Sequence, residues 1–425
     1  MNITLTLRIL GALLLFLAIA LLFPVPFSWF YGDGAAGAFF LSAIISAGCG
    51  GLLYSQFRSG ADLSVREGFA VVTFGWTFFA LFGALPFFFS GAIPSYLNAF
   101  FETMSGFTTT GSTILTDIEA MPPSLLLWRS LTQWLGGMGI IVLSLAILPM
   151  LGVGGMQLFK AEVPGPTADR LKPRIQDTAK LLWGVYVLLT GAEVILLMVG
   201  GMGFFDGINH AFTTMATGGF STRNASVAAY DSAFIDWVIT LFMFLAGVNF
   251  SLHYLALRGK LGDFIRNEEF LFFSGLAILG TLLITLLNMG GTYADFFDNL
   301  RYSAFQAVSI LTTTGFGTAD YELWPVLCQY LLVFAMFIGG CAGSTGGGMK
   351  VARILLLFKH AHVQIYRLIH PRAVRLVKLG DRPVAKDVMQ SILGFFAVYL
   401  GVFVAASFIM AGVGMDLTSA SASVI

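Results

Sequence analysis

The chain has 425 residues, of which 57% are hydrophobic and only 11% are charged, and its formal net charge at pH 7 is zero. Soluble domains carry about 25% charged residues, so the composition excludes an ordinary soluble enzyme and predicts an all-α polytopic membrane protein. The balanced charge gives no sign of a nucleic-acid partner. The cysteines Cys49, Cys328 and Cys341 stand in apolar segments without a CxxC motif, and we expect them to be small buried hydrophobic residues.

The first two expected spans are 3–23 and 37–57, each close to the 20 or so apolar residues that a bilayer-crossing helix needs. Pro24 and Pro26 follow the first span at the place where a signal peptide would have small residues and a cleavage site. We therefore expect this helix to be retained, and the two spans to form an N-terminal helix pair in domain 1–66.

The next segments repeat one plan: a span, a short capped helix, a glycine–threonine loop and a return span. Pro94 and Ser95 open the short helix of the first unit, and Asp206 is expected to cap that of the second. We expect unit 1 over 67–151 and unit 2 over 152–263. The expected spans of these two units are 68–89, 125–151, 181–202 and 234–257.

The third unit, 264–382, is expected to have a span at 270–289, a short helix capped by Asp295 and Asp298, and a return helix that starts at Trp324. Glycines break that return helix before apolar sequence resumes at 351–358. A fourth unit begins at 383–425, with a span at 388–410. At the earlier spacing its loop glycine would fall just past residue 425, so we expect the sequence to be truncated within this unit.

Charge is unevenly divided between the two ends of the spans. Lys and Arg concentrate in the links that follow the return helices, above all in 359–386, which the positive-inside rule assigns to the cytoplasm. The opposite side holds Arg129, Arg223 and Arg301 together with twelve acidic residues: Asp33, Glu102, Asp117, Glu119, Asp206, Asp231, Asp236, Asp295, Asp298, Asp320, Glu322 and Asp416. We expect an outer vestibule that concentrates cations, although Asp206, Asp298 and Asp416 are expected to be helix caps first.

The three loops read FETMSGFTTTGST (101–113), HAFTTMATGGFST (210–222) and FQAVSILTTTGFGTAD (305–320). Unpaired backbone groups at membrane depth must be shielded by protein or line a wet path. Carbonyls of such a loop can replace the hydration shell of a cation, and the C-terminus of the preceding helix favours positive charge. One loop could be a packed turn, but three in equivalent places predict pore loops, with Gly111, Gly218 and Gly315 as their central glycines.

The run GGCAGSTGGGMK at 339–350 is too rich in glycine for a straight helix in lipid. An irregular backbone at that depth must line a cavity, and it is flexible enough for two arrangements; close helix packing is the alternative. Lys350 could repel cations until the loop moves, or could snorkel to the cytoplasmic interface. A nucleotide-binding P-loop is excluded because Met349 stands where its lysine is required.

With TTTGST, MATGGF and TTTGFG as filters, the chain resembles the Trk/Ktr/HKT superfamily of potassium transporters over nearly its whole length. The resemblance implies repeats around a central pore, K⁺ as the transported ion and no covalently bound cofactor. It implies a selectivity filter at Thr109, Thr110, Gly111, Ala216, Thr217, Gly218, Thr313, Thr314 and Gly315. Within it, K⁺ would be held by Thr110, Gly111, Thr217, Gly218, Thr314 and Gly315. Ala216 is expected to stand where the other repeats have Thr109 and Thr313, and glycine at 111, where plant Na⁺ transporters have serine, favours K⁺.

The resemblance also implies that the glycine-rich run is an intramembrane gate. Its residues are Gly339, Gly340, Gly343, Ser344, Thr345, Gly346, Gly347, Gly348 and Lys350. It further implies a multi-pass protein of the bacterial inner membrane, a homodimer, and a cytosolic nucleotide-binding ring of the TrkA type on the basic links, which could instead only contact anionic membrane lipids.

Two alternatives to a simple K⁺ pore remain at this stage. The first is proton- or sodium-coupled symport, in which Glu193 within a span could carry the proton, or could be a buried structural carboxyl. The second is an intramembrane enzyme, disfavoured because the sequence has neither HExxH nor GxSxG. Asn249 and His253 are expected to make helix contacts, and Gly136, Gly137 and Gly247 to permit close helix approach near the filter.

Overall fold

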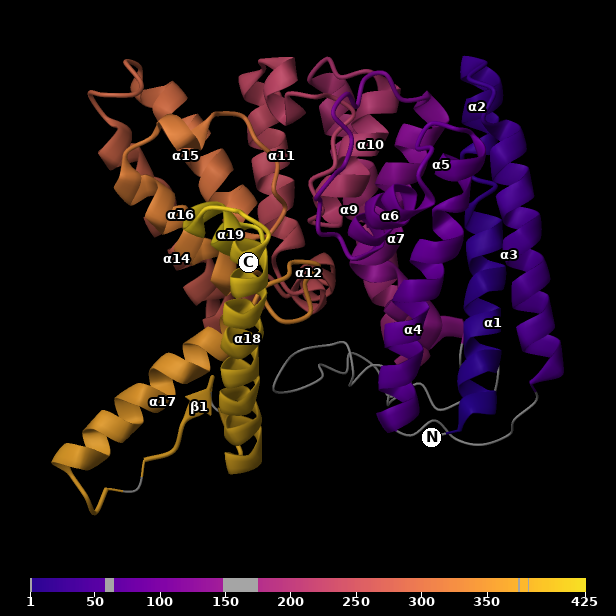
Figure 1. Ribbon diagram of the computed structural model, residues 1–425. Coiled ribbons are helices and arrows are strands. Elements are labelled where there is room, and N and C mark those ends of the chain that lie inside the picture. The colour runs from indigo at the N-terminus through magenta and orange to yellow at the C-terminus, as the bar shows by residue number, and fades with distance from the viewer. Residues whose placement is uncertain (1, 58–64, 148–174, 374, 381) are drawn as a thin grey trace. The chain divides into compact units, whose positions relative to one another are not determined.

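A computed structural model describes residues 2–57, 65–147, 175–373, 375–380 and 382–425 (Figure 1). The described chain is built from helices, apart from one hairpin in which β1 (Lys378–Leu379) pairs antiparallel with β2 (Arg382–Pro383). Internal contacts divide it into two compact units. The first unit ends at Ala246 and also takes in Thr314–Ala319; the second holds 247–313 and 320–425.

The first unit contains α1 (Ile3–Ala20), α2 (Val25–Tyr31), α3 (Ala36–Gln56), α4 (Val65–Gly83), α5 (Leu85–Phe89), α6 (Tyr96–Phe107), α7 (Pro123–Ile147), α9 (Ile175–Val199), α10 (Phe204–Met215), the 3₁₀ helix η2 (Ser226–Tyr230) and α11 (Ala233–Ala246). The second contains α12 (Phe250–Leu257), α13 (Gly262–Arg266), α14 (Glu268–Asn288), α15 (Phe296–Leu311), η3 (Tyr321–Leu323), α16 (Val326–Ile338), α17 (Val351–Ile369), the hairpin, α18 (Lys386–Gly412) and α19 (Leu417–Ala422).

Six segments of the described chain are long and apolar enough to cross a membrane, which confirms a polytopic membrane protein. They are Ile3–Tyr31, Ala36–Gln56, Arg66–Phe89, Lys180–Val199, Glu268–Asn288 and Lys386–Gly412. The first is longer than the predicted 3–23, because α2 resumes the helix directly after Pro24. Most of the predicted basic link 152–180 lies outside the described residues.

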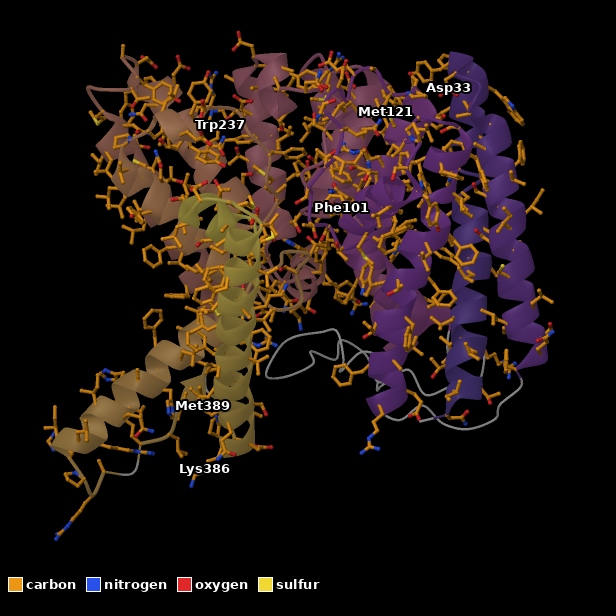
Figure 2. All side chains as sticks on the ribbon, viewed as in Figure 1. Asp33, Phe101, Met121, Trp237, Lys386 and Met389 are labelled. Atoms are coloured by element: carbon orange, nitrogen blue, oxygen red, sulfur yellow. The ribbon has the colours of Figure 1, made fainter. Side chains whose placement is uncertain are left out.

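The N-terminal helix pair is held by glycines on facing sides of α1 and α3. A Cβ built on Gly11 would come within 2.6 Å of the Tyr54 backbone nitrogen, and one on Gly50 within 2.8 Å of the Gly11 carbonyl oxygen. Without side chains at these positions the two backbones approach closely, as small residues allow in membranes. Asp33 lies in the turn between α2 and α3 (Figure 2). Its carboxylate ties this pair to α7 by accepting a hydrogen bond from the Ser124 backbone nitrogen at 2.9 Å.

Within the described residues, the predicted order of a long helix, a short helix, a loop and a return helix occurs three times, and α18 with α19 begins it again. The caps differ from prediction at two places. Gly203, not Asp206, precedes α10, and Asp295 alone caps α15, accepting from the Asp298 backbone nitrogen. Ser95 and Asp416 are caps as expected. The two contact units cut across the predicted repeats, since the third loop is divided between them.

The second return span, predicted over 234–257, is not one continuous helix. It ends at Ala246 and resumes as α12 at Phe250. The Asn249 side chain accepts a hydrogen bond from the Ser251 backbone nitrogen at 2.8 Å, which caps the new helix. Gly247 and Asn249 thus mark a break in the second return helix. The third return helix has a counterpart: its predicted break is confirmed between Ile338 and Val351.

Replacement of Gly50 by valine is expected to lower the free energy of unfolding by about 1–3 kcal/mol, because the new side chain would force α1 and α3 apart. Thermal unfolding in detergent measures this. Gly51→Val is the matched control: it lies on the same helix, and its Cβ would meet no described atom within 4 Å. Equal loss of stability in both variants would contradict the close helix contact.

Candidate functional site

The three loops share one backbone conformation. Each pore helix ends four residues before a glycine with positive φ: Gly111 at 80°, Gly219 at 74° and Gly315 at 85°. Two residues before each of these glycines a threonine also has positive φ, between 52° and 60°: Thr109, Thr217 and Thr313. A β-branched residue is uncommon there and strained by about 1–3 kcal/mol, so its threefold recurrence marks a conformation that the surrounding structure imposes.

This shared conformation corrects the predicted register of the second loop by one residue. Gly219, not Gly218, is equivalent to Gly111 and Gly315, and Gly218 is equivalent to Thr110 and Thr314. Thr217 is equivalent to Thr109 and Thr313. Ala216 was expected at this equivalent position from the sequence. The sequence pattern was ambiguous because Gly218 and Gly219 are consecutive and both are candidates. Only the end of the preceding helix and the sign of φ distinguish them.

In the first unit, the glycine of one loop packs against a backbone carbonyl of the next loop. A Cβ on Gly111 would overlap the carbonyl oxygen of Gly218, and a Cβ on Gly219 would overlap that of Thr314. Each contact therefore joins the glycine of one loop to the carbonyl one residue earlier in the next loop. For Gly315 no described atom would lie within 4 Å of a Cβ. Two of the three loops therefore pack their glycine directly against a backbone carbonyl of the next loop.

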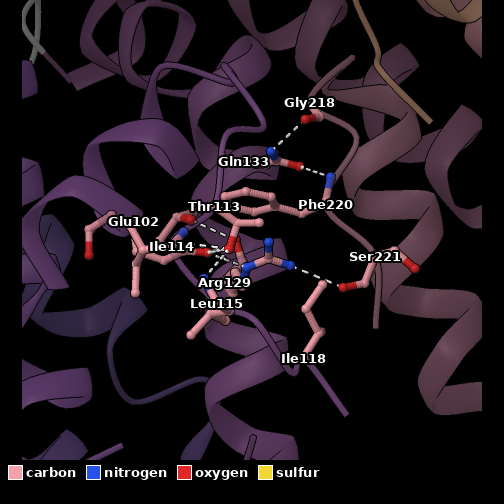
Figure 3. A network of polar contacts seen from close by, with 12 residues as sticks. Glu102, Thr113, Ile114, Leu115, Ile118, Arg129, Gln133, Gly218, Phe220 and Ser221 are labelled. Atoms are coloured by element: carbon pink, nitrogen blue, oxygen red, sulfur yellow. Dashed lines mark hydrogen bonds and ion pairs between the residues drawn. The ribbon is translucent and has the colours of Figure 1, made fainter. Parts of the chain in front are cut away.

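Buried side chains of α7 hold the second loop in place (Figure 3). The Gln133 amide donates from Nε2 to the Gly218 carbonyl at 2.7 Å and accepts from the Phe220 backbone nitrogen at 3.1 Å. One turn earlier, Arg129 donates to the Ser221 carbonyl at 3.0 Å, and its guanidinium lies 3.5 Å from the centre of the Phe220 ring. Gly136 and Gly137 allow the same helix to approach Phe107 and Ala216, as expected.

Arg129 also forms a buried ion pair with Glu102 of pore helix α6, at 2.6 Å. The same carboxylate accepts from the Thr113 hydroxyl at 2.9 Å and from the Ile114 backbone nitrogen at 3.0 Å, so it anchors the end of the first loop (Figure 3). Glu102, Arg129 and Gln133 were not predicted as site residues. The available signal was the spacing of Arg129 and Gln133, one turn apart in an otherwise apolar helix.

The predicted acidic vestibule is weaker than the sequence suggested. All three outer arginines pair with acids: Arg129 with Glu102, Arg223 with Asp206 at 2.8 Å and Arg301 with Asp298 at 3.1 Å. Burial opposes ionisation of Asp206, but hydrogen bonds from Thr222 and Arg223 outweigh it and lower the pKa of this carboxyl. Asp206 is thus an ionised anchor of the second loop, and Glu102 belongs to the buried support.

The outer segment η2 fastens the third loop. The Ala228 backbone nitrogen donates to the Gly317 carbonyl at 3.1 Å, and the Gly317 nitrogen donates to the Ser226 hydroxyl oxygen at 3.3 Å. His210 of α10 is fully buried behind the second loop, where Nε2 lies 3.0 Å from the Ser221 hydroxyl oxygen. Its ring is 5.8 Å from that of Phe316. The second and third loops are therefore joined by side chains as well as by backbone.

In the second unit, residues 339–350 form the irregular loop that was predicted. Gly339, Gly343 and Gly348 have positive φ. The loop is folded back on itself, since the Met349 nitrogen donates to the Phe337 carbonyl at 3.1 Å and the Val351 nitrogen to the Gly340 carbonyl at 3.0 Å. The backbone hydrogen bonds of this glycine-rich loop run within the loop and to its neighbours, so the segment does not continue the helix.

Three neighbours hold the glycine-rich loop. The Cys341 nitrogen donates to the Gly247 carbonyl at 2.8 Å, so the break in the second return helix receives the loop. The Ala342 nitrogen donates to the Glu269 carboxylate at 2.6 Å. The Gly347 nitrogen donates to the Thr313 hydroxyl at 2.7 Å, which joins this loop directly to the third pore loop.

Lys350 is almost fully buried, with 6% of its surface exposed, and does not snorkel to the interface. Its ammonium donates to the Gly346 carbonyl and lies 3.5 Å from the Ser344 carbonyl oxygen. The lysine therefore caps carbonyls within the glycine-rich loop. Its backbone has a φ of 71°, unusual for a side chain with Cβ, which shows how tightly the loop is folded at its junction with α17.

The remaining residues that the sequence analysis singled out are Glu193, His253 and the cysteines. Glu193 is fully buried on α9; neither carboxyl oxygen makes a hydrogen bond of ordinary geometry within the described chain, although Thr214 of α10 is nearby. His253 packs between the rings of Phe250 and Phe264. Cys49 is partly buried and the other two cysteines are buried, much as expected.

The chain matches the family described as "TrkH: Cation transport protein" over residues 36–289 and 269–422. It is 43% identical to the Trk system potassium uptake protein TrkH of Salmonella typhimurium over 98% of this chain and 88% of that protein. It is 36% identical to TrkG of Escherichia coli K12, another Trk system potassium uptake protein, over 97% and 86%. The solved structure of the potassium transporter TrkH from Vibrio parahaemolyticus is similar, with a TM-score of 0.89 and 38% identity over 99% of this chain and 88% of that one.

Glu102→Gln is expected to destabilise the protein by about 3 kcal/mol, because it leaves the buried Arg129 without a counter-charge. Tryptophan fluorescence during thermal unfolding measures the loss. Glu119→Gln is the control: Glu119 also pairs with an outer arginine, but at 3.9 Å and with 46% of its side chain exposed, so its loss should change stability by less than about 1 kcal/mol. A similar effect of both substitutions would refute the supporting role of Glu102.

Proposed function

This chain belongs to the TrkH family of cation transport proteins, and from that premise we propose that it carries K⁺ into the cell across the inner membrane. The observation that carries the proposal is the succession of pore loops, in which the glycine of one loop packs against a carbonyl oxygen of the next. A transporter, and not an intramembrane enzyme, is the function shared by the curated relatives, which are named as potassium uptake proteins.

In the proposed filter, backbone carbonyls replace the water around K⁺ without a fixed charge that would trap the ion. Thr109 and Thr217, the positive-φ threonines of the first two loops, turn their hydroxyls away from the proposed ion site. The Thr109 hydroxyl donates to the Thr108 carbonyl and the Thr217 hydroxyl to the Ala216 carbonyl, both at 2.7 Å. This leaves the backbone oxygens to face the ion. In the corrected register, we assign the K⁺ contacts to Thr110, Gly111, Gly218, Gly219, Thr314 and Gly315.

We propose that the glycine-rich loop is the gate. It is bonded at Thr313 to the inner end of the third pore loop, and a Cβ on Gly346 would lie 3.1 Å from the Thr312 carbonyl oxygen, so no room is left between them. Opening requires the Gly347–Thr313 bond to break and the loop to adopt a second arrangement. Lys350, bonded to carbonyls of the loop, would move with it.

Coupled symport with H⁺ or Na⁺ is the second candidate. It is favoured by one observation, the fully buried Glu193 beside pore helix α10. Current that reverses at the K⁺ equilibrium potential in Glu193→Gln and in the parent protein alike would exclude it. For partners, the name of the Trk system supports a multi-component complex; we propose a homodimer and a TrkA-like cytosolic ring on the basic link 359–386, with membrane lipids around both.

Gly315→Ser is expected to lower the K⁺/Na⁺ permeability ratio about tenfold, equivalent to about 1.4 kcal/mol of discrimination. The reason is that φ at 85° is unfavourable for serine, so the carbonyls around it must shift. Reversal potentials in planar bilayers measure the ratio. Gly290→Ser is the matched control, because Gly290 has φ at 78° and, like Gly315, no described atom within 4 Å of its Cβ position. An unchanged ratio in Gly315→Ser would remove it from the filter.

Thr313→Val is expected to raise flux in the absence of the cytosolic partner about fivefold, because it removes one hydrogen bond, worth about 1 kcal/mol, that holds the gate closed. Thr217→Val is the control at the equivalent position of the second loop, where the hydroxyl bonds only to its own backbone. ⁸⁶Rb⁺ efflux from proteoliposomes compares the two. Equal flux in both variants would show that Thr313 does not hold the gate.

A further inference from the structure

The cytoplasmic part of the second unit contains a cavity of about 220 Å³ between α17, the hairpin and the first turns of α18. Figure 2 shows Lys386 and Met389, which belong to its wall, at the lower end of α18. Its floor is apolar: Val363 and Met389 are 5% and 6% exposed, and Met389 packs with Leu356 of α17 in one apolar cluster. Neither the pore loops nor the glycine-rich loop contributes to it.

The rim of this cavity is basic. Arg367, Arg375 and Lys386 line it together with His360, and none of the described residues around it is a carboxylate. Arg367 also donates to the Arg375 carbonyl at 2.8 Å, which fixes the segment that bears the second arginine. The acid on adjacent α14, Glu268, is already engaged by Lys359 and by the Gly380 nitrogen. Several charged donors thus converge on one space, and no carboxylate of the described residues lines it.

Two neighbouring features indicate the level of the cavity relative to the membrane. Lys386 begins the apolar span Lys386–Gly412, so it stands where that helix enters the membrane. On α17, Phe358, Ile365 and Ile369 are 59–68% exposed at spacings of seven and four residues, which places them on one helix face. An amphipathic helix with such a face lies at the boundary between head groups and acyl chains. The basic rim is therefore at the level of lipid head groups.

We propose that this cavity binds the phosphate head group of an anionic phospholipid from the cytoplasmic leaflet. The phosphodiester would lie among Arg367, Arg375 and Lys386, and the glycerol and first methylenes over Val363 and Met389. The volume is below the roughly 300–1,000 Å³ of pockets for drug-sized ligands, which suits a head group better than a nucleotide. Inorganic phosphate offers the same charge but would leave the apolar floor uncovered. This inference rests on the function proposed above, in which membrane lipids surround the protein, and it specifies one lipid-binding site.

Native mass spectrometry of the full chain in detergent tests the proposal, with dioctanoyl phosphatidylglycerol as the probe and dioctanoyl phosphatidylcholine as its zwitterionic counterpart. Phosphatidylglycerol should bind in preference, and Arg375→Gln/Lys386→Gln should weaken its binding about tenfold or more. Arg372→Gln/Lys260→Gln is the matched control: it removes the same charge at exposed residues outside the cavity and should leave binding unchanged. Unfolding temperatures of both variants establish that they are folded.

Three outcomes would overturn the proposal. Displacement of phosphatidylglycerol by millimolar inorganic phosphate would identify a free-phosphate site. Equal weakening in both double variants would indicate diffuse attraction to basic residues. Loss of binding to a TrkA-type ring, but not to the lipid, in Arg375→Gln/Lys386→Gln would make the cavity a protein contact. Because lipid binding is measured without an ion gradient, none of these results depends on whether the pore selects K⁺.

Discussion

Backbone polar groups within a membrane must be paired or wet, and this constraint governs every irregular segment of the protein. Each pore loop leaves helical geometry within apolar surroundings, and the structure supplies partners for the groups that do not face the next loop. Gln133 pairs with both edges of the second loop, and Glu102 receives the end of the first. We propose that backbone carbonyls of the filter residues supply the oxygen ligands of K⁺.

The same requirement explains why the glycine-rich loop and the break in the second return helix occur together. Cys341 and Phe250 exchange backbone hydrogen bonds with Gly247 and Gly343, so each irregular segment pairs the groups that the other exposes. The bond from Gly347 joins the glycine-rich loop to the Thr313 side chain of the third loop, which we propose to be part of the filter. In the proposed gate, this bond must break on opening, in addition to any change at the bonds of the loop to Gly247 and Glu269.

The sequence predicted the spans, pore helices and irregular glycine-rich run, because apolar length, capping serine or aspartate, and glycine density are local properties. It failed where the answer depends on backbone conformation or on contacts that form only in the folded chain. The choice between Gly218 and Gly219 is set by φ and by the helix end at Met215. Glu102 was assigned to the outer vestibule because the buried Arg129 that neutralises it is 27 residues away. Lys350 was not expected to cap its own loop, since only the folded loop brings those carbonyls to it.

The central claim is that the contacting pore loops select K⁺, and uptake of ⁸⁶Rb⁺ into proteoliposomes with K⁺, Na⁺ or Li⁺ as competitor tests it most directly. The cytosolic partner is supplied so that a closed gate does not mask the result. Uptake that K⁺ suppresses and that equal concentrations of Na⁺ and Li⁺ leave unchanged is the predicted result. Equal suppression by all three ions, or no uptake by folded protein, would contradict the account. The glycine contacts between loops would then serve only to pack the loops together.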